Sequence, residues 1–311
     1  MDNKRYIDQK EQFLVRFWGV RGSYPTPGPG TVRHGGNTAC VEVQVGKYTL
    51  IFDAGSGIIR LGEELMKRAK TQPLTIWLFM THGHGDHLIG LPFFAPLFNP
   101  RAAIHLFGPQ LAGQSVKQLV TPLMSPPYFP IDIHHLPSKR TYHTIVDEKL
   151  LVWMNGKPIL DTVHGCFNGT KNKRDSVVMA RMTQSHPLNG ALNYRIEYAG
   201  HSVVYATDVE WEHGCEAEFV SFIEGADVLI HDAQYTQQDY KVKSGYGHCT
   251  VEMAVEAARA AQVRELILFH HEPTYDDNQL DVMERQAQAH FAQTRSAREG
   301  MEIDLLATST E

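Results

Sequence analysis

The sequence lacks the features that mark exported, membrane-spanning or disulfide-bonded proteins. Its first residues, MDNKRYIDQKEQ, are charged and contain no apolar segment of the kind that directs secretion. The longest apolar stretch, Leu88 to Phe98, is too short to cross a bilayer and is interrupted by Pro92 and Pro96. The four cysteines are scattered with no CxxC spacing, which is typical of single thiols in a reducing compartment. We therefore expect a cytoplasmic protein.

Also missing is the excess of basic residues that characterises proteins whose main task is to hold long nucleic acids. The formal net charge is −6 at pH 7, which is compatible with small anionic substrates. The 311 residues are 42% hydrophobic and 21% charged, and this balance excludes a largely disordered or fibrous chain. We expect a globular protein with a large core.

Strand-like and helix-like patterns alternate along the chain, which indicates an α/β fold. Short apolar or alternating runs predict strands over Leu14–Trp18, Ala39–Val45, Tyr48–Phe52, Thr75–Met80, Ser202–Ala206, Ala226–Ile230, Glu265–Phe269 and Met301–Leu306. Amphipathic patterns predict helices over Ile58–Ala69, Gln110–Leu119, Thr250–Ala261 and Leu280–Arg298. We expect a polar tail over residues 1–12 and one domain over 13–311, with 122–144 as an insertion that shapes the substrate pocket.

Several predicted strands are followed within two residues by a His or Asp. Buried strands that deliver polar side chains at one end of a sheet form a site there, as in other α/β architectures. Asp53 follows a strand at the same sheet end, and we expect its carboxylate to accept a hydrogen bond from a ligand histidine. The Gly- and Pro-rich segment SYPTPGPGTVRHGGNT predicts a surface loop beside this site.

Histidine is abundant, with 17 in the chain, and the segment Thr81-His82-Gly83-His84-Gly85-Asp86-His87 directly follows a predicted strand. Residues two apart on an extended backbone point the same way, so His82 and His84 can hold one ion. A turn at Gly85 directs Asp86 and His87 toward a second ion. Nitrogen and oxygen ligands of this kind suit Zn²⁺, and the carboxylates also admit Mn²⁺ or Fe.

This segment resembles the HxHxDH motif of the metallo-β-lactamase superfamily. His186, Asp208 and His270 follow in the order that the family shows, and the resemblance extends from Phe17 to about Asp277. It implies an α/β fold, the metallo-β-lactamase αββα sandwich, in which two mixed β-sheets are flanked by helices.

Carried across residue by residue, the resemblance implies a two-metal site. One metal would be bound by His82, His84 and His186, the second by Asp86, His87 and His270, and Asp208 would bridge the two. Asp86 would also help to orient the attacking water. His271 adjoins His270 and would replace it as the ligand if the preceding strand ended one residue later.

Two more segments resemble the ribonuclease Z group of phosphodiesterases. Val228–Ala233 is similar to its HEAT segment, with Asp232 in place of the Glu, and Gly247–Thr250 is similar to its GHST segment. The opening FWGVRGSYPTPG resembles bacterial phosphodiesterase-like members, including cyclic-nucleotide phosphodiesterases. His248 oriented by Asp232 is the natural general acid, because imidazole is partly protonated near pH 7 and a carboxylate partner raises that fraction.

We therefore expect a dinuclear metal-dependent phosphoric diester hydrolase that cuts small phosphodiesters, cyclic nucleotides first, with a metal-activated hydroxide. The alternatives are a transfer-RNA 3′-processing endonuclease, a non-catalytic nucleotide sensor, and a thioester or lactone hydrolase. The acidic balance and the lack of an evident Gly/Pro/Lys-rich arm weigh against transfer RNA. A homodimer is common in the group. Four cationic side chains could contact a substrate phosphate, namely Arg21, Lys139, Arg140 and Arg181.

Overall fold

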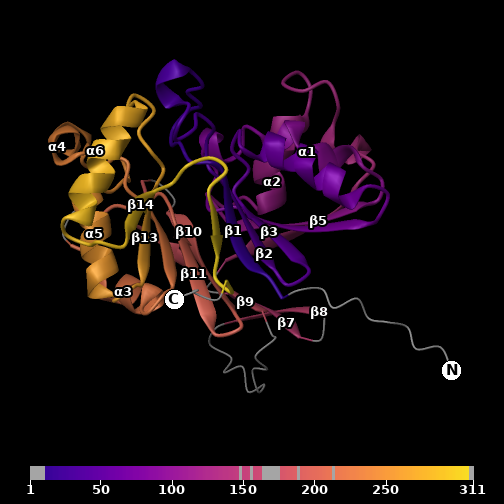
Figure 1. Ribbon diagram of the computed structural model, residues 1–311. Coiled ribbons are helices and arrows are strands. Elements are labelled where there is room, and N and C mark those ends of the chain that lie inside the picture. The colour runs from indigo at the N-terminus through magenta and orange to yellow at the C-terminus, as the bar shows by residue number, and fades with distance from the viewer. Residues whose placement is uncertain are drawn as a thin grey trace.

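The computed structural model describes residues 11–146, 149–154, 157–162, 176–187, 190–211 and 214–307. Two β-sheets face each other in the middle of the molecule, and helices cover the outer side of each sheet (Figure 1). This is the sandwich of two mixed sheets flanked by helices that the family resemblance implies.

The first sheet, within the described residues, has the strand order β15-β1-β2-β3-β4-β5-β6. Its strands are β1 (Phe13–Gly19), β2 (Cys40–Val45), β3 (Tyr48–Phe52), β4 (Leu74–Phe79), β5 (Ala102–Pro109), β6 (Lys139–Ile145) and β15 (Glu302–Asp304). The pairs from β3 to β6 are parallel, and those from β15 to β3 are antiparallel. Since parallel neighbours end at the same edge, β3 and β4 present their C-terminal residues side by side.

The second sheet has the order β14-β13-β12-β11-β10-β9-β7-β8 in the described part of the chain. Its strands are β7 (Lys149–Met154), β8 (Lys157–Thr162), β9 (Ser176–Thr183), β10 (Ala191–Tyr198), β11 (His201–Ala206), β12 (Val228–Asp232), β13 (Glu265–Phe269) and β14 (Thr294–Ser296). The strands β11, β12, β13 and β14 pair in parallel, so their C-terminal ends also share one edge.

Helices α1 (Ile58–Ala69) and α2 (Val116–Val120) cover the first sheet, whereas α3 (Ala217–Ile223), α4 (Gln237–Lys243), α5 (Val251–Ala260) and α6 (Asp277–Gln288) lie on the side of the second (Figure 1). Short 3₁₀ turns occupy Pro29–Thr31, Gly85–His87, Leu91–Phe93, Ala95–Phe98, Thr121–Met124 and Ile133–His135. Within the described residues, no helix is long and apolar enough to pass through a bilayer.

The main core lies between the two sheets and contains a group of packed aromatic rings among aliphatic side chains. Phe79 stacks between Phe52 and Phe107, with ring centroids 5.1 Å and 4.9 Å away, and Tyr194 of the second sheet meets Phe79 edge-on at 5.5 Å. Aromatic rings in such arrangements bury large apolar areas and resist displacement. The core therefore fixes the position of one sheet relative to the other.

Helix boundaries differ from the prediction by more than one residue at two places. The helix expected over Gln110–Leu119 begins only at Val116, because Ser115 forms a capping box with Gln118. The helix expected over Leu280–Arg298 begins at Asp277, after the N-cap Asp276, and ends at Gln288. Residues Thr294–Ser296 instead form β14, which pairs with β13.

The outer segments of the prediction fall partly beyond the described residues. Residues 1–10 of the expected polar tail lie outside them, and the first described strand, β1, begins at Phe13. The expected insertion 122–144 ends in β6, an edge strand that pairs with β5. Cys40 and Cys249 are buried free thiols and Cys215 is a partly buried one, while Cys166 lies outside the described residues.

Candidate metal centre

The site lies where the C-terminal ends of strands from both sheets meet. Asp53 follows β3 and the His82–His87 segment follows β4, while Asp208 follows β11 and His270 follows β13. Asp232 is the last residue of β12. The prediction that polar side chains gather at these strand ends is therefore confirmed in its geometry.

Three of these residues adopt a left-handed backbone conformation that non-glycine residues rarely take. The φ angles are +62° at Asp53, +57° at Asp208 and +61° at His270. Non-glycine residues in this left-handed region cost free energy and persist only where the surroundings hold them. Each lies one or two residues beyond the end of a strand, and the left-handed backbone turn there directs its side chain toward the centre.

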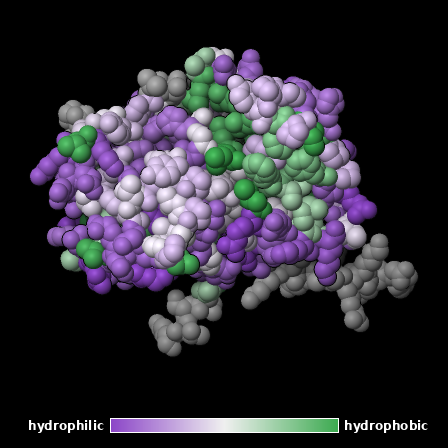
Figure 2. Space-filling model, turned by 90° about the horizontal axis from the view of Figure 1, so that it is seen from above, coloured by the Kyte–Doolittle hydropathy of each residue, from purple (hydrophilic) through white to green (hydrophobic). Residues whose placement is uncertain are grey.

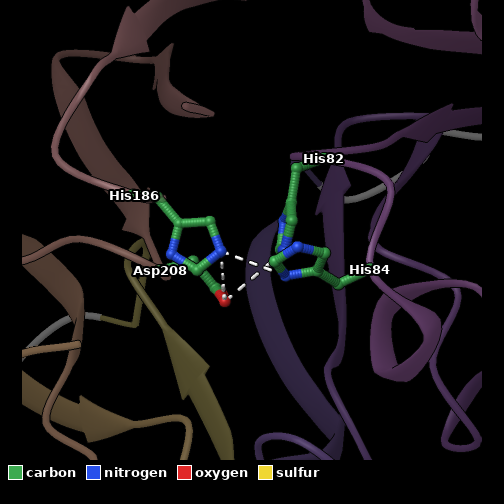
Figure 3. Close-up of side chains that lie close together, drawn as sticks. All are labelled: His82, His84, His186 and Asp208. Carbon is green, nitrogen blue, oxygen red and sulfur yellow. Dashed lines mark hydrogen bonds and ion pairs between the residues drawn. The ribbon is translucent and has the colours of Figure 1, made fainter. Parts of the chain in front are cut away.

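One group of candidate ligands consists of His82, His84, His186 and Asp208, whose ligand atoms all lie within 4.8 Å of one another. His186 Nε2 lies 3.1 Å from His84 Nδ1 and 3.8 Å from Asp208 Oδ1, and His82 Nε2 lies 3.5 Å from the same oxygen (Figure 3). Two imidazoles come from the first sheet, and the other two side chains come from the second.

A second group consists of Asp86, His87 and His270, again with ligand atoms within 4.8 Å of one another. The Asp86 Oδ2 atom lies 3.2 Å from His270 Nε2 and 3.3 Å from His87 Nε2. The backbone N–H of Ser23, in the Gly- and Pro-rich loop, donates to the same oxygen at 2.8 Å. The loop thus lies beside the site, as predicted.

Asp208 lies between the two groups and faces both. Its Oδ1 points to His82 and His186, whereas its Oδ2 lies 3.1 Å from His87 Nε2 and 3.4 Å from His270 Nε2. One carboxylate with an oxygen toward each group is the arrangement that a bridging ligand needs.

Hydrogen bonds on the far side of the rings fix which nitrogen faces the centre. His87 Nδ1 donates to Asp53 Oδ2 at 2.8 Å, His186 Nδ1 to Gly247 O at 3.0 Å, and His270 Nδ1 to Gln234 Oε1 at 3.1 Å. With Nδ1 protonated, each of these rings turns a bare Nε2 lone pair inward. The expected hydrogen bond to Asp53 is therefore present, and its donor is the candidate ligand His87.

These lone pairs provide a test of whether metal ions fit. His87 Nε2 and His270 Nε2 lie 3.2 Å apart, and His82 Nε2 is buried with no hydrogen-bond partner. Facing lone pairs repel unless a cation or proton lies between them. Nitrogen ligands about 2.0–2.1 Å from a tetrahedral zinc ion are roughly 3.4 Å apart, which matches these separations. The residues fit two metal ions that share Asp208.

The ionisation of four of the candidate ligands agrees with this role, whereas in the metal-free protein Asp208, Asp86 and Asp53 outweigh burial and raise the pKa of His87. Burial lowers the pKa of His82, His84 and His186, which favours the neutral imidazole that a metal requires. Burial would raise the pKa of Asp208, but the imidazoles of His270, His87 and His82 outweigh it and hold that pKa well below the usual range. Asp208 is therefore a carboxylate at neutral pH.

His248 lies beside this cluster and is held by Asp232. Its Nδ1 donates to Asp232 Oδ2 at 2.8 Å, and its ring stacks on that of His270 with centroids 4.9 Å apart. Asp232 also accepts hydrogen bonds from the backbone N–H groups of Asp208 and Cys249. His248 can itself form a ligand group with Asp208 and His270. The predicted pair of His248 and Asp232 is thus brought together at the centre.

The other candidates from the sequence lie elsewhere. His271 points away from the centre, since its Nε2 donates to Ala297 O at 2.9 Å. Arg21 is fully buried and donates to the carbonyl groups of Gly35, Glu272 and Tyr275. Arg140 donates to Leu136 O and Ser138 O, and Arg181 to Glu218 O. These arginines hold backbone in place, and their contacts give no support to a role with substrate phosphate.

Sequence reasoning missed several residues that support the ligands. Gln234 Oε1 accepts a hydrogen bond from His270 Nδ1. The Tyr205 hydroxyl donates to Asp53 Oδ2 at 3.0 Å from the opposite sheet. Thr81 donates from its N–H and hydroxyl groups to Asp53 Oδ1 and accepts from His82 Nδ1. Of these three residues, only Thr81 could have been found from the sequence, because it lies between β4 and His82. The contacts of the other two depend on chain segments far apart in sequence.

Comparison with known proteins places the chain in a family. Residues 48–271 match the family described as "Beta-lactamase superfamily domain". The chain belongs to the beta-lactamase superfamily. It is 28% identical over 286 residues to Ribonuclease Z of Pyrococcus horikoshii, covering 84% of this chain and 87% of that protein. It is also 30% identical over 268 residues to Ribonuclease Z of Thermococcus gammatolerans, covering 78% and 81%.

Solved structures of this superfamily share the fold. The metallo-beta-lactamase fold protein YhfI from Bacillus subtilis matches with a TM-score of 0.64 and 20% identity, over 95% of this chain and all of that one. The short form of human tRNase Z matches with a TM-score of 0.61 and 20% identity, over 93% of this chain and 98% of that one. The predicted fold and the predicted ribonuclease Z-like branch are confirmed, and the chain is a metal-dependent hydrolase.

Replacement of Asp53 by Asn should weaken metal binding. An amide offers His87 Nδ1 a weaker acceptor and must also satisfy Thr81 and Tyr205, so the ring loses its fixed orientation. Such partners typically contribute about 10- to 100-fold in metal affinity. Competition with a chromogenic chelator measures the change. Affinity equal to that of the wild type would contradict the role assigned to Asp53.

The metal-free protein should show an unusually basic His248. Burial opposes its protonation, but the Asp232 carboxylate outweighs burial and raises the pKa of His248 to about 9. Because this pKa exceeds the unfolded value of about 6.5, the pair stabilises the fold fully below that pH. The contribution is lost as the pH rises toward about 9. NMR titration of the imidazole measures the pKa. Asp232→Asn should lower it, and an unchanged value would rule out Asp232 as the cause.

Proposed function

We propose that the protein is a dinuclear metal-dependent phosphodiesterase of the ribonuclease Z kind, which cuts a phosphodiester bond in RNA. The observation that carries the proposal is the His248–Asp232 pair, 2.8 Å apart, next to two ligand groups that share Asp208. The relatives named above are called Ribonuclease Z, and this favours RNA over the small cyclic nucleotide expected from the sequence.

The centre suits hydrolysis of a phosphate ester. Two divalent ions, Zn²⁺ in the first instance, would lower the pKa of a water and neutralise charge on the phosphate. They would be held by His82, His84 and His186 on one side and by Asp86, His87 and His270 on the other, with Asp208 common to both. Asp86, whose Oδ2 accepts from the Ser23 N–H, would help to orient the attacking water.

His248 would serve the leaving group. When the bond between phosphorus and the ester oxygen breaks, that oxygen departs as an alkoxide and takes a proton from the imidazolium of His248. Asp232 holds the ring by Nδ1, which leaves Nε2 as the atom that can donate. The same carboxylate stabilises the imidazolium before the transfer.

This pair weighs against a nucleotide sensor and against thioester hydrolysis. A non-catalytic nucleotide sensor has no need of a proton donor beside its ligands. A thiolate leaving group from a thioester also departs without a proton, so a buried imidazolium would serve little purpose there. Small phosphodiesters are the second candidate, because a net charge of −6 gives no general attraction to a long polyanion.

Replacement of His248 by Ala should lower the rate on a substrate with an alkoxide leaving group by about 10²–10⁴-fold. A p-nitrophenolate leaves without a proton, so its ester should lose much less. Single-turnover rates on the two substrates, with metal content determined in parallel, measure the difference. An equal loss on both substrates, or loss of metal, would remove His248 from the acid role.

The substrate class is tested on metal-reconstituted wild-type protein. We expect turnover of precursor transfer RNA to exceed that of 3′,5′-cyclic AMP and of bis(p-nitrophenyl) phosphate, compared as kcat/KM. Faster turnover of the cyclic nucleotide would replace RNA by the small phosphodiester. Hydrolysis of a thioester or lactone, with none of these phosphodiesters, would refute the proposed function altogether.

A further inference from the structure

Glu210 is a buried carboxylate that the proposed chemistry does not use. It lies two residues after Asp208, and only 8% of its surface is exposed. Its Oε1 accepts from the Tyr240 hydroxyl and from the Gly245 N–H, and its Oε2 accepts from the Gly247 N–H, each at 2.7 Å. A charge placed in the interior is costly unless hydrogen bonds satisfy it, so these bonds are strong constraints.

The segment that Glu210 holds is a tight loop leading to His248. Gly245 and Gly247 have φ angles of +83° and +90°, a conformation that disfavours other residues. A Cβ atom at Gly247 would lie 2.3 Å from His186 Nδ1, so the loop packs directly against a candidate ligand. Both glycines lie between α4 and α5, and the N–H groups of both donate to Glu210.

This loop links Glu210 to two parts of the centre. Gly247 O accepts from His186 Nδ1 at 3.0 Å, and the next residue along the chain is His248. The Glu210 N–H itself donates to Ser185 Oγ, at 3.4 Å, beside His186. Gly247, whose carbonyl group orients His186 and which directly precedes His248, is thus held by one carboxylate.

We propose that Glu210 is a positioning residue, which holds the 245–247 loop so that His248 is placed against the leaving oxygen and His186 against its metal ion. The inference rests on the proposed function and adds to it a residue that acts through others. A shift of about 1 Å in a reacting group can cost up to 100-fold in rate, so such a support has measurable consequences.

A carboxylate is required because both of its oxygens accept. Glutamine keeps the length of the side chain but presents an NH₂ group to one of the two glycine N–H donors. The loop must then move away at that point. The Tyr240 hydroxyl remains un-ionised, since burial and the hydrogen bond to Glu210 raise the pKa of Tyr240 to about 12. Tyr240 therefore donates to Glu210 at neutral pH.

The main test compares Glu210→Gln with Glu42→Gln. Glu42 is fully buried in β2, where it accepts from Trp18 and Arg68, and it serves as the control for loss of a buried carboxylate. We expect Glu210→Gln to lower the single-turnover rate on the alkoxide-leaving substrate by about tenfold or more, and on the nitrophenolate ester by less. Glu42→Gln should leave the ratio of the two rates at the wild-type value.

A readout without metal or turnover checks the structural step. In the metal-free protein, amide hydrogen exchange over 244–248 should be faster in Glu210→Gln than in the wild type, and unchanged in Glu42→Gln. Chelator competition should also show weaker metal binding in Glu210→Gln, because His186 loses its fixed partner. Unchanged exchange and affinity would overturn the proposal.

A double-mutant cycle separates this inference from the proposed function. If Glu210 acts through His248, then Glu210→Gln should change the ratio of the two rates in the wild type and leave it unchanged in His248→Ala. An additive effect in the cycle would refute the action through His248. If His248→Ala itself fails to discriminate between the leaving groups, the general-acid assignment fails first, while the exchange and metal data still judge the loop.

Discussion

The buried carboxylate of Asp208, surrounded by imidazoles, is the interaction on which the rest of the centre depends. It follows a strand of the second sheet and faces His82 and His87 of the first, so it joins the two halves of the sandwich. Neither half holds a complete set of the candidate ligands. A charge in this position is tolerated only because the neighbouring rings compensate it, and metal ions would complete that compensation.

Strain and support are balanced around this centre. The positive φ angles of Asp53, Asp208 and His270 cost free energy, and a dense set of hydrogen bonds offsets it. Asp53 alone accepts from Thr81, His87 and Tyr205, and the last of these bonds crosses from one sheet to the other.

Figure 2 shows apolar side chains gathered on one half of the upper face, while the other half is mainly hydrophilic. The predicted homodimer stays a prediction.

Local signals predicted much of the fold. The strands Tyr48–Phe52 and Glu265–Phe269 and the helix Ile58–Ala69 have the predicted bounds, because apolar periodicity and flanking glycines act within a few residues. The helix expected to reach Arg298 stops at Gln288 because Thr294–Ser296 pairs with β13. Strand pairing between distant segments overrides local helix preference, and a single sequence gives no direct signal for it.

The sequence by itself determined the types and order of the candidate ligands. The spacing in His82–His87 follows from backbone geometry, and His186, Asp208 and His270 follow from the resemblance to the family. Only the tertiary structure decided how they are used. It turned His270 inward and gave His271 a backbone carbonyl, it aimed the two oxygens of Asp208 at different groups, and it brought Glu210 to the loop before His248. These outcomes depend on contacts between segments far apart in the chain, and such contacts exist only after the two sheets have packed.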